Sequence, residues 1–167
     1  MVEFIWHEDL VPINLPIRQI YGVLFVPDGR ILLRREKGQY QLTGGKPLEW
    51  ESPEQTLQRE ADEEINCKIG KPYYIGYQEV FDGEQRYAQV RYVAQITEIG
   101  PARPDSDRPC WTYGRELVSY LRAMELLPYG NITEPLIEAA VRAAEEHHLF
   151  VQQNLPPEVL NLEEIVD

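Results

Sequence analysis

Residues 45–67 read GKPLEWESPEQTLQREADEEINC, and this stretch predicts a helix with an acidic edge. Ser52 followed by Pro53, with Gln55 three positions after the serine, is the pattern of a helix start in which Ser52 is the N-cap. Apolar residues then recur at every fourth position, namely Leu57, Ala61 and Ile65. We therefore expect a helix that packs one narrow apolar stripe against the core of the protein.

The acidic edge consists of Glu60, Glu63 and Glu64, at positions i, i+3 and i+4. On a helix these side chains project from one face, and each like-charged pair costs a few tenths of a kcal/mol. A hard divalent cation would offset that repulsion, because Mg²⁺ and Mn²⁺ prefer oxygen ligands and often bridge to substrate phosphates. Taken alone, however, such a motif is more often a solvated acidic face than a metal site.

The spacing around these acidic residues favours the metal site. Glu51 follows Gly45 after five residues, Arg59 follows after seven more, and the three acidic residues stand directly beyond. This arrangement resembles the Nudix box, the signature of the Nudix hydrolase family, which includes MutT-like proteins. One fixed position differs, because Asn66 stands where the family has a glycine near the helix end. Asparagine is the residue that best replaces glycine in a left-handed helix cap, so the resemblance holds.

Three departures from the family pattern change the loop beside the site. Thr43 stands where relatives often have proline, Leu48 where glutamate is common, and Trp50 where a glycine usually precedes Glu51. Either the Trp50 ring packs on the domain as a structural wedge, or it forms a wall of the substrate pocket and stacks on the leaving group or the base. A box loop is normally exposed at the cleft, which favours the pocket wall. Other aromatic residues near the motifs are Tyr77, Tyr87 and Trp111.

The resemblance implies a fold and an activity. Members of the family share an α/β/α sandwich around a mixed β-sheet, and they hydrolyse nucleoside diphosphates linked to a further group with the help of divalent metal ions. We therefore expect an α/β protein with a Nudix hydrolase domain over residues 1–148 and Mg²⁺ or Mn²⁺ as cofactor. Features that accompany ADP-ribose, dinucleoside polyphosphate or coenzyme A preference in relatives are absent, which leaves nucleoside triphosphates and nucleotide sugars as candidate substrates.

The resemblance also implies roles for single residues. Glu60 and Glu64 are expected to be the principal metal ligands, and Glu63 is expected to be a further ligand or the general base that takes a proton from the attacking water. Arg59 is expected to pair with Glu51 and so to hold the loop against the helix. Together these five residues form the expected catalytic group.

Relatives often add a metal-binding acid from a loop that precedes a tryptophan-containing strand. Here that loop is residues 101–109, which lead into Trp111, and its candidates are Asp105 first and Asp107 second. The Gly44 carbonyl is expected to join the same metal shell. Weaker acidic candidates on the preceding hairpin are Glu79 and Asp82.

Phosphate contacts are expected from basic residues close to the box. The candidates are Lys46 and either Arg34 or Arg35, because strand alternation lets only one of two adjacent arginines face the site. Less direct candidates are Arg18 and Arg91. The three histidines, His7, His147 and His148, are too dispersed to form a metal set and are expected at the surface.

The rest of the chain alternates strand and helix signals. Strand signals over 19–26 and 31–35 flank a Pro-Asp-Gly turn, and those over 73–81 and 87–99 flank an Asp-Gly-Glu turn, so each pair predicts a hairpin. Helices are expected over 116–127 and from Thr133, as cap, through His147. The buried stripe expected for the second helix is Ile137, Ala140, Val141 and Ala144.

The tail, residues 149–167, carries too many apolar side chains to remain in water. It is expected to pack either on its own domain or on a second subunit of a homodimer. The sequence does not separate these two alternatives.

Length, net charge and cysteine content limit the classes of partner and the cellular compartment that are expected. The chain has 167 residues, a mass of 19.4 kDa and a net charge of −12. The length suits one domain, and so acidic a surface argues against nucleic acid or anionic membrane as partner. Two cysteines, Cys67 and Cys110, make no disulfide framework and indicate a reducing compartment, so a cytoplasmic location is expected. The sequence shows no signal-peptide pattern and no membrane-length apolar run.

Two other classes of function compete with the hydrolase. The domain could bind a nucleotide as a sensor without cleaving it, as some relatives do after losing box carboxylates; here all the carboxylates are present. It could also be an interaction module with an accidental acidic helix, which the glycine, glutamate and arginine spacing argues against.

Overall fold

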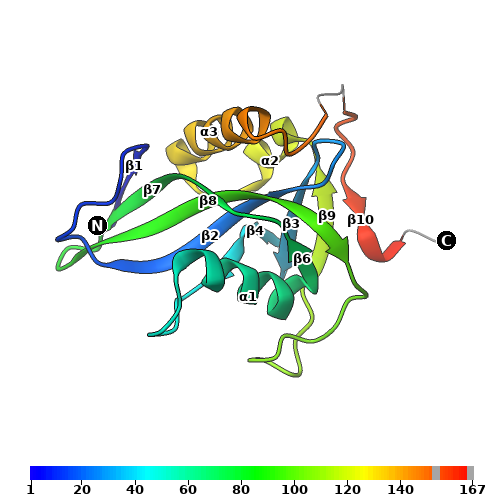
Figure 1. Ribbon diagram of the computed structural model, residues 1–167, viewed down its shortest axis with the longest axis horizontal. Helices are drawn as coiled ribbons and strands as arrows, with labels where there is room; N and C mark the ends of the chain where they lie inside the picture. The colour runs from blue at the N-terminus through cyan, green and yellow to red at the C-terminus, as the bar shows by residue number, and fades with distance from the viewer. Residues whose placement is uncertain (152–154, 165–167) are drawn as a thin grey trace.

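The computed structural model describes residues 1–151 and 155–164 of the chain. A mixed β-sheet lies between one helix on one face and two helices on the other (Figure 1). Helix α1 (Pro53–Ile65) covers the first face, and α2 (Tyr120–Leu126) and α3 (Thr133–Glu146) cover the second. This is the α/β/α sandwich expected from the sequence.

The main path of the sheet runs in the order β1-β7-β8-β2-β3-β9-β10, with β4 paired to β3, β5 to β2 and β6 to β8. Strand β2 lies parallel to β8 and antiparallel to β3 and β5, which makes the sheet mixed. The strands are β1 Glu3–His7, β2 Ile17–Phe25, β3 Ile31–Glu36, β4 Gln39–Gln41, β5 Thr43–Gly45, β6 Cys67–Ile69, β7 Tyr73–Phe81, β8 Arg86–Ile99, β9 Gly114–Val118 and β10 Leu160–Asn161.

Both predicted hairpins are confirmed. Strands β2 and β3 pair antiparallel across the first turn, where the Gly29 N–H donates to the Val26 carbonyl at 2.9 Å. Strands β7 and β8 pair antiparallel across the second, where the Asp82 N–H donates to the Gln85 carbonyl at 3.1 Å.

Two apolar cores lie on the two faces of the sheet. The core beneath α1 contains the predicted stripe of that helix, since Leu57, Ala61 and Ile65 are fully buried. The other core lies beneath α2 and α3, where Ile137, Ala140 and Ala144 are buried as expected and Val141 is half-buried. Burial on both faces fixes the sheet rigidly beneath α1, the helix that carries the acidic edge.

The helix predicted over 116–127 is wrong in its first part. Residues 116–118 belong to β9, which pairs antiparallel with β3, and α2 begins only after Ser119. The Ser119 hydroxyl caps α2 by accepting from the Arg122 N–H at 3.1 Å. Pairing with the neighbouring strand β3 outweighs the helix propensity of residues such as Glu116 and Leu117, because propensity is a weak local preference.

Thr133 is not the cap of α3. A 3₁₀ turn over Gly130–Ile132 runs directly into the helix, and the N-cap, Ile132, makes no side-chain cap bond. The Thr133 hydroxyl instead accepts from the Tyr129 N–H at 3.2 Å and donates to the Leu127 carbonyl at 3.4 Å. It therefore braces the connection between α2 and α3.

The described part of the tail lies against the domain. Leu149 is buried, and the Phe150 ring stacks on Phe25 with centroids 5.2 Å apart. Strand β10 then pairs with β9, with Leu160 opposite Leu117, and a 3₁₀ turn over Leu162–Glu164 follows. The expectation for the tail also covers residues 152–154 and 165–167, which lie outside the described residues.

Each helix of the described residues is too short or too polar to cross a membrane.

Candidate active site

Helix α1 starts and ends as its sequence predicts. The Ser52 hydroxyl accepts from the Gln55 N–H at 3.2 Å, and the Gln55 side chain accepts from the Ser52 N–H at 2.8 Å, which completes a capping box. At the other end Asn66 adopts the left-handed conformation, with φ of 46°. These two caps fix which residues of α1 face the sheet and which face the neighbouring loops.

Two carboxylates of α1 are held beneath the glycine strand β5. The Glu64 carboxylate accepts from the Gly44 N–H at 3.0 Å and lies 3.2 Å from the Arg34 guanidinium. Glu60 packs against Gly45 so closely that a Cβ there would stand 2.5 Å from Oε1 of Glu60. Both glutamates are buried, and only glycine lets the strand pass this close to Glu60.

Arg59 joins the loop after β5 to the helix, as expected. Its guanidinium donates to the Glu51 carboxylate at 2.6 Å and 3.1 Å and to the Lys46 carbonyl at 3.1 Å. Glu51 also accepts from the Leu48 N–H at 2.8 Å. The Arg59 hydrogen bond lowers the pKa of Glu51 to about 2, so this carboxylate is ionised at neutral pH.

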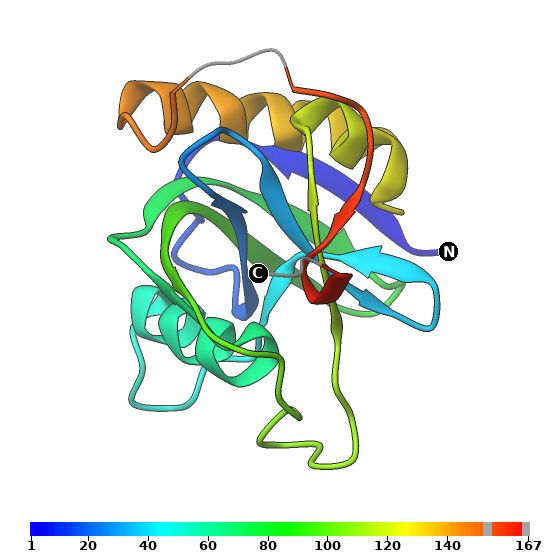
Figure 2. The ribbon, with the colours of Figure 1, turned by 90° about the vertical axis from the view of Figure 1, so that its right-hand side faces the viewer.

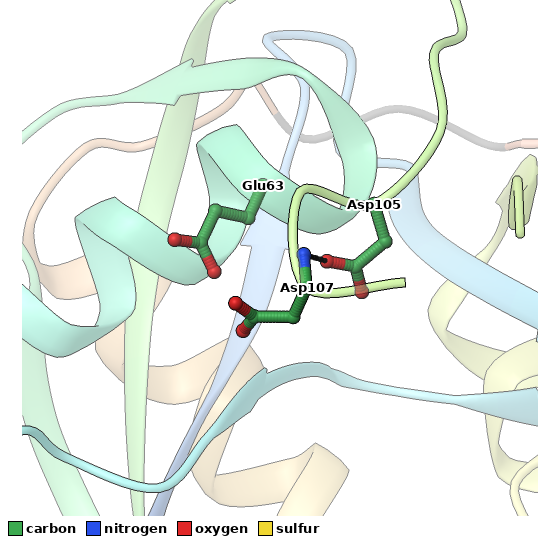
Figure 3. Close-up of side chains that lie close together, drawn as sticks. All are labelled: Glu63, Asp105 and Asp107. Carbon is green, nitrogen blue, oxygen red and sulfur yellow. Dashed lines mark hydrogen bonds between the residues drawn. The ribbon is translucent and has the colours of Figure 1, made fainter. Parts of the chain in front are cut away.

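A second acidic group forms between α1 and the loop from β8 to β9. Carboxylate oxygens of Glu63, Asp105 and Asp107 lie within 4.8 Å of one another, with Glu63 on the helix and the two aspartates on the loop (Figure 3). Figure 2 shows this loop extending past α1, on the side of the sheet away from α2 and α3. The structure thus brings Glu63 together with both candidate acids of the loop.

Hydrogen bonds within the loop hold this group in place. The Asp105 N–H donates to the Trp111 carbonyl at 2.8 Å, and the Arg108 N–H donates to the Asp105 carbonyl at 3.0 Å. The Asp107 N–H donates to the Asp105 carboxylate at 2.9 Å. Asp105 is buried, whereas Asp107 is exposed, so the loop presents one inner and one outer carboxylate.

Burial opposes charge on the acidic edge of α1. Burial is the largest cause that raises the pKa of Glu64, to about 8, against the opposing effects of Arg34 and the Gly44 N–H. Burial likewise raises the pKa of Glu60 to about 7, with Glu63 adding to the rise and Arg59 opposing it. The pKa of Glu63 is raised for the same reason. Helix α1 therefore presents carboxylates that a neighbouring cation would help to ionise.

Arg34 and Arg35, the two alternative phosphate ligands predicted on β3, have different surroundings in the structure. Arg34 is buried beside Glu64, and its guanidinium lies 4.6 Å from the centroid of the Tyr113 ring. Arg35 points away and lies 3.3 Å from Glu116 on β9. Strand alternation on β3 thus places Arg34, and not Arg35, beside the acidic edge of α1. The contact of Arg34 with Tyr113 was missed by the sequence analysis, because a single tyrosine carries no local signal of a tertiary contact.

The more distant basic candidates lie apart from the acidic residues. Arg91 is fully buried between the rings of Tyr21 and Tyr129, at 4.9 Å and 5.8 Å from their centroids. Arg18 lies over the ring of Tyr87 and donates to Gln85 near the β7–β8 turn. Neither arginine makes an ion pair with a carboxylate among the described residues.

The weaker acidic candidates are engaged by neighbours on their own hairpin and, for Glu79, also on β1. Glu79 accepts from Arg86 at 2.9 Å and lies 2.9 Å from the ring nitrogen of His7. Asp82 accepts from the backbone N–H groups of the turn it begins. In the described part of the chain, neither joins the group formed by Glu63 and the loop.

Trp50 is 72% exposed, so the wedge packed on the domain is wrong. A hollow of about 710 Å³ opens beside the preceding residues of the loop, and Trp50 is not among the described residues that line it, which are Lys46, Pro47, Leu48, Glu49, Arg59, Glu60 and Asp107. Of the other aromatic candidates, Tyr77 is buried and stacks on His7, whereas Trp111 lies on the loop of Asp105 with Arg108 over its ring.

We expect the metal-free protein to lose stability as pH rises. Glu60 and Glu64 keep their protons in the folded state at pH values where the unfolded chain has lost them, so the free energy of unfolding should fall between about pH 4.5 and pH 8. The fall should amount to a few kcal/mol. Chemical denaturation in chelator at several pH values measures the free energy of unfolding. The Glu64→Gln variant should show a smaller fall of this free energy with pH. An equal slope in wild type and Glu64→Gln would contradict the prediction.

Comparison with known proteins places the chain in a family. The model of the NUDIX domain matches residues 16–128. A NUDIX hydrolase from Nitrosomonas europaea superposes with a TM-score of 0.58 at 17% identity, over 77% of this chain and 90% of that chain. A UDP-X diphosphatase superposes with a TM-score of 0.56 at 16% identity, over 84% of this chain and 68% of that chain.

A third solved structure is the Bacillus subtilis pyrophosphohydrolase BsRppH, with a TM-score of 0.53 and 21% identity. The match covers 59% of this chain and 62% of the BsRppH chain. A search of curated protein sequences gave no significant match. At these identities the solved structures show a shared fold.

Proposed function

Because this chain belongs to the Nudix family, we propose that it is a metal-dependent Nudix hydrolase that cleaves a diphosphate linkage in a nucleoside diphosphate derivative. The observation that carries the proposal is the convergence of two carboxylate groups. Glu60 and Glu64 lie beneath β5, and Glu63 lies with Asp105 and Asp107. Buried carboxylates with raised pKa values are typical of a functional site rather than of a solvated helix face.

The residues present fit a hard divalent cation such as Mg²⁺ or Mn²⁺. Oxygen ligands come from two elements, and the oxygens of Glu63, Asp105 and Asp107 are already within 4.8 Å of one another. Further ligands would be Glu60, Glu64 and the carbonyl of Gly44. When bound, such an ion neutralises phosphate charge and acidifies a bound water.

The protein residues would then divide the remaining work. Arg34 and Lys46 supply positive charge for the phosphates, and Arg59 with Glu51 fixes the loop over the helix. One carboxylate accepts the proton of the attacking water, and Glu63, the least buried of the three on α1, would be either this base or a further metal ligand.

The substrate would be a nucleoside triphosphate or a nucleotide sugar. The test is phosphate release from a panel of nucleoside diphosphate derivatives, measured with Mg²⁺ and with Mn²⁺. Turnover of at least one class with either ion supports the proposal, and no turnover of any compound with both ions would refute it. A sensor that binds nucleotide without cleaving it is less favoured, because all the box carboxylates are in place.

Trp50→Ala is expected to weaken substrate binding without unfolding the protein. Because the side chain is largely exposed, the melting temperature should hardly change. If the ring stacks on the base or the leaving group, the Michaelis constant should rise about tenfold, as the loss of roughly 1–3 kcal/mol of stacking would require. An unchanged Michaelis constant would show that Trp50 plays no part in binding.

The partners and the location can also be proposed. The proposed ligand is a small nucleotide, and a homodimer is the assembly to test by size-exclusion chromatography with light scattering. Both cysteines are free, which suits a reducing compartment such as the cytoplasm.

A further inference from the structure

Four residues from separate parts of the chain meet where α1 ends, and we call them the junction: Asn66, Gly100, Arg115 and Glu163. Arg115 on β9 is buried at the centre of the junction. Its guanidinium donates to the Ile65 carbonyl and to the Gly100 carbonyl, both at 2.8 Å. One side chain thus ties the last turn of α1 to the residue that precedes the loop bearing Asp105.

Glu163 of the tail provides the counter-charge to Arg115. Its carboxylate accepts from Arg115 at 2.5 Å and 3.1 Å, while its own N–H donates to the Asn161 side chain at 2.9 Å. Among the described residues, Arg115 forms an ion pair with no carboxylate other than that of Glu163. Arg115 is 5% exposed and Glu163 is 39% exposed, so loss of the Glu163 charge would leave a buried guanidinium with two backbone carbonyls and no carboxylate.

Asn66 adds a second tie between the helix and the loop. Its side-chain amide donates to the Pro101 carbonyl at 2.8 Å, and its carbonyl accepts from the Gly100 N–H at 2.9 Å. A Cβ on Gly100 would collide with the Asn66 amide, so the two segments are in direct contact. A glycine at position 66 would cap the helix equally well but could not make the bond to Pro101.

We propose that Arg115, Glu163 and Asn66 are positioning residues that set the separation between the two halves of the metal site, and that the C-terminal segment thereby tunes metal affinity. This inference rests on the proposed function. One half of the site, Glu63, lies two residues before Ile65, and the other half, Asp105 and Asp107, lies on the loop that starts at Gly100. The junction is the buried connection between them; an exposed one also exists, in which Arg103 of the loop donates to the Asp62 carboxylate at 2.9 Å. Glu163 lies beyond the residues that match the family model.

The test is direct Mn²⁺ binding, measured by electron paramagnetic resonance on the full chain. Glu163→Gln should raise the Mn²⁺ dissociation constant about tenfold, the lower end of what loss of an outer partner of a metal ligand costs. Asn66→Gly should give a smaller rise, since it removes one bond and keeps the cap. At saturating Mn²⁺ the turnover number of both variants should return close to the wild-type value, because the groups that touch substrate are intact.

The matched control is Glu8→Gln, which breaks a surface ion pair with Arg142 at 2.7 Å, far from the junction in the sequence. It should leave Mn²⁺ binding unchanged. Hydrogen exchange provides a second measurement: the loop amides of Asp105 and Arg108 should exchange faster in Glu163→Gln than in Glu8→Gln.

Either of two results would overturn this inference and leave the proposed function unaffected. One is a wild type that binds Mn²⁺ together with a Glu163→Gln variant whose dissociation constant is unchanged. The other is a Glu163→Gln variant that only melts at a lower temperature, with metal binding and loop exchange as in the control. If Glu163→Gln fails to fold, Asn66→Gly decides by the same criteria. A wild type that binds no Mn²⁺ would overturn the proposed function as well.

Discussion

Glu60→Gln and Glu64→Gln should each lower turnover by about two orders of magnitude or more, since charge stabilisation by a bound metal is worth several kcal/mol and each 1.4 kcal/mol is a factor of ten. Glutamine keeps the shape of the side chain and removes the charge that a cation needs. Both variants should fold, because burial already disfavours the charged form of these residues. Steady-state kinetics with saturating Mg²⁺, alongside circular dichroism, measures the effect.

The matched control for these variants is Glu54→Gln. Glu54 lies in the first turn of the same helix, and its carboxylate only accepts a hydrogen bond from the Tyr92 hydroxyl at 3.4 Å, which a glutamine oxygen can also accept. Its turnover should be close to that of the wild type. Equal losses at all three positions would mean that the helix acts only as a scaffold.

Removal of divalent metal should abolish hydrolysis and lower the melting temperature. On the proposed function, the cation held by the acidic residues neutralises phosphate charge and acidifies the attacking water, and both effects are lost with the cation. The stability lost follows from linkage, about 2.7 kcal/mol for a metal present at a hundred times its dissociation constant. Differential scanning calorimetry with chelator and with added Mg²⁺ measures it.

The chelation experiment needs a control that separates metal loss from chelator binding. Mg²⁺ added back in excess should restore both turnover and melting temperature. Glu64→Gln should show a smaller shift of the melting temperature between chelator and Mg²⁺ than the wild type. Full turnover in excess chelator would refute the metal mechanism.

The sequence predicted the parts of the site that are local. Ser52, Pro53 and Gln55 fixed the start of α1, and the spacing of its acidic residues needed only helix geometry. The turn residues predicted both hairpins for the same reason, since a turn is specified within a few positions. The pairing of Arg59 with Glu51 came from the family resemblance and is present in the structure.

What the sequence could not predict depends on contacts between distant segments. The part of 116–127 that became β9 was decided by its pairing with β3, far away in the sequence. The choice between Asp105 and Asp107 stayed open because the loop has no regular structure, and the structure places both beside Glu63. The exposure of Trp50 and the burial of Arg115 against the tail are likewise tertiary properties that no local pattern contains.

Arg59 makes contacts that bear on how quickly a cation enters and leaves the acidic edge. Besides Glu51, it donates to Glu60 at 3.1 Å and to Glu63 at 3.0 Å. A cation bound by Glu60 and Glu63 would displace these two bonds, while the bond to Glu51 would keep the Arg59 guanidinium within reach to re-form them. Arg59 would therefore compete with the metal for these carboxylates. On the proposed mechanism, such competition favours rapid exchange of free ions and selects a cation that arrives already complexed to a polyphosphate, whose negative charge gives Arg59 a new partner.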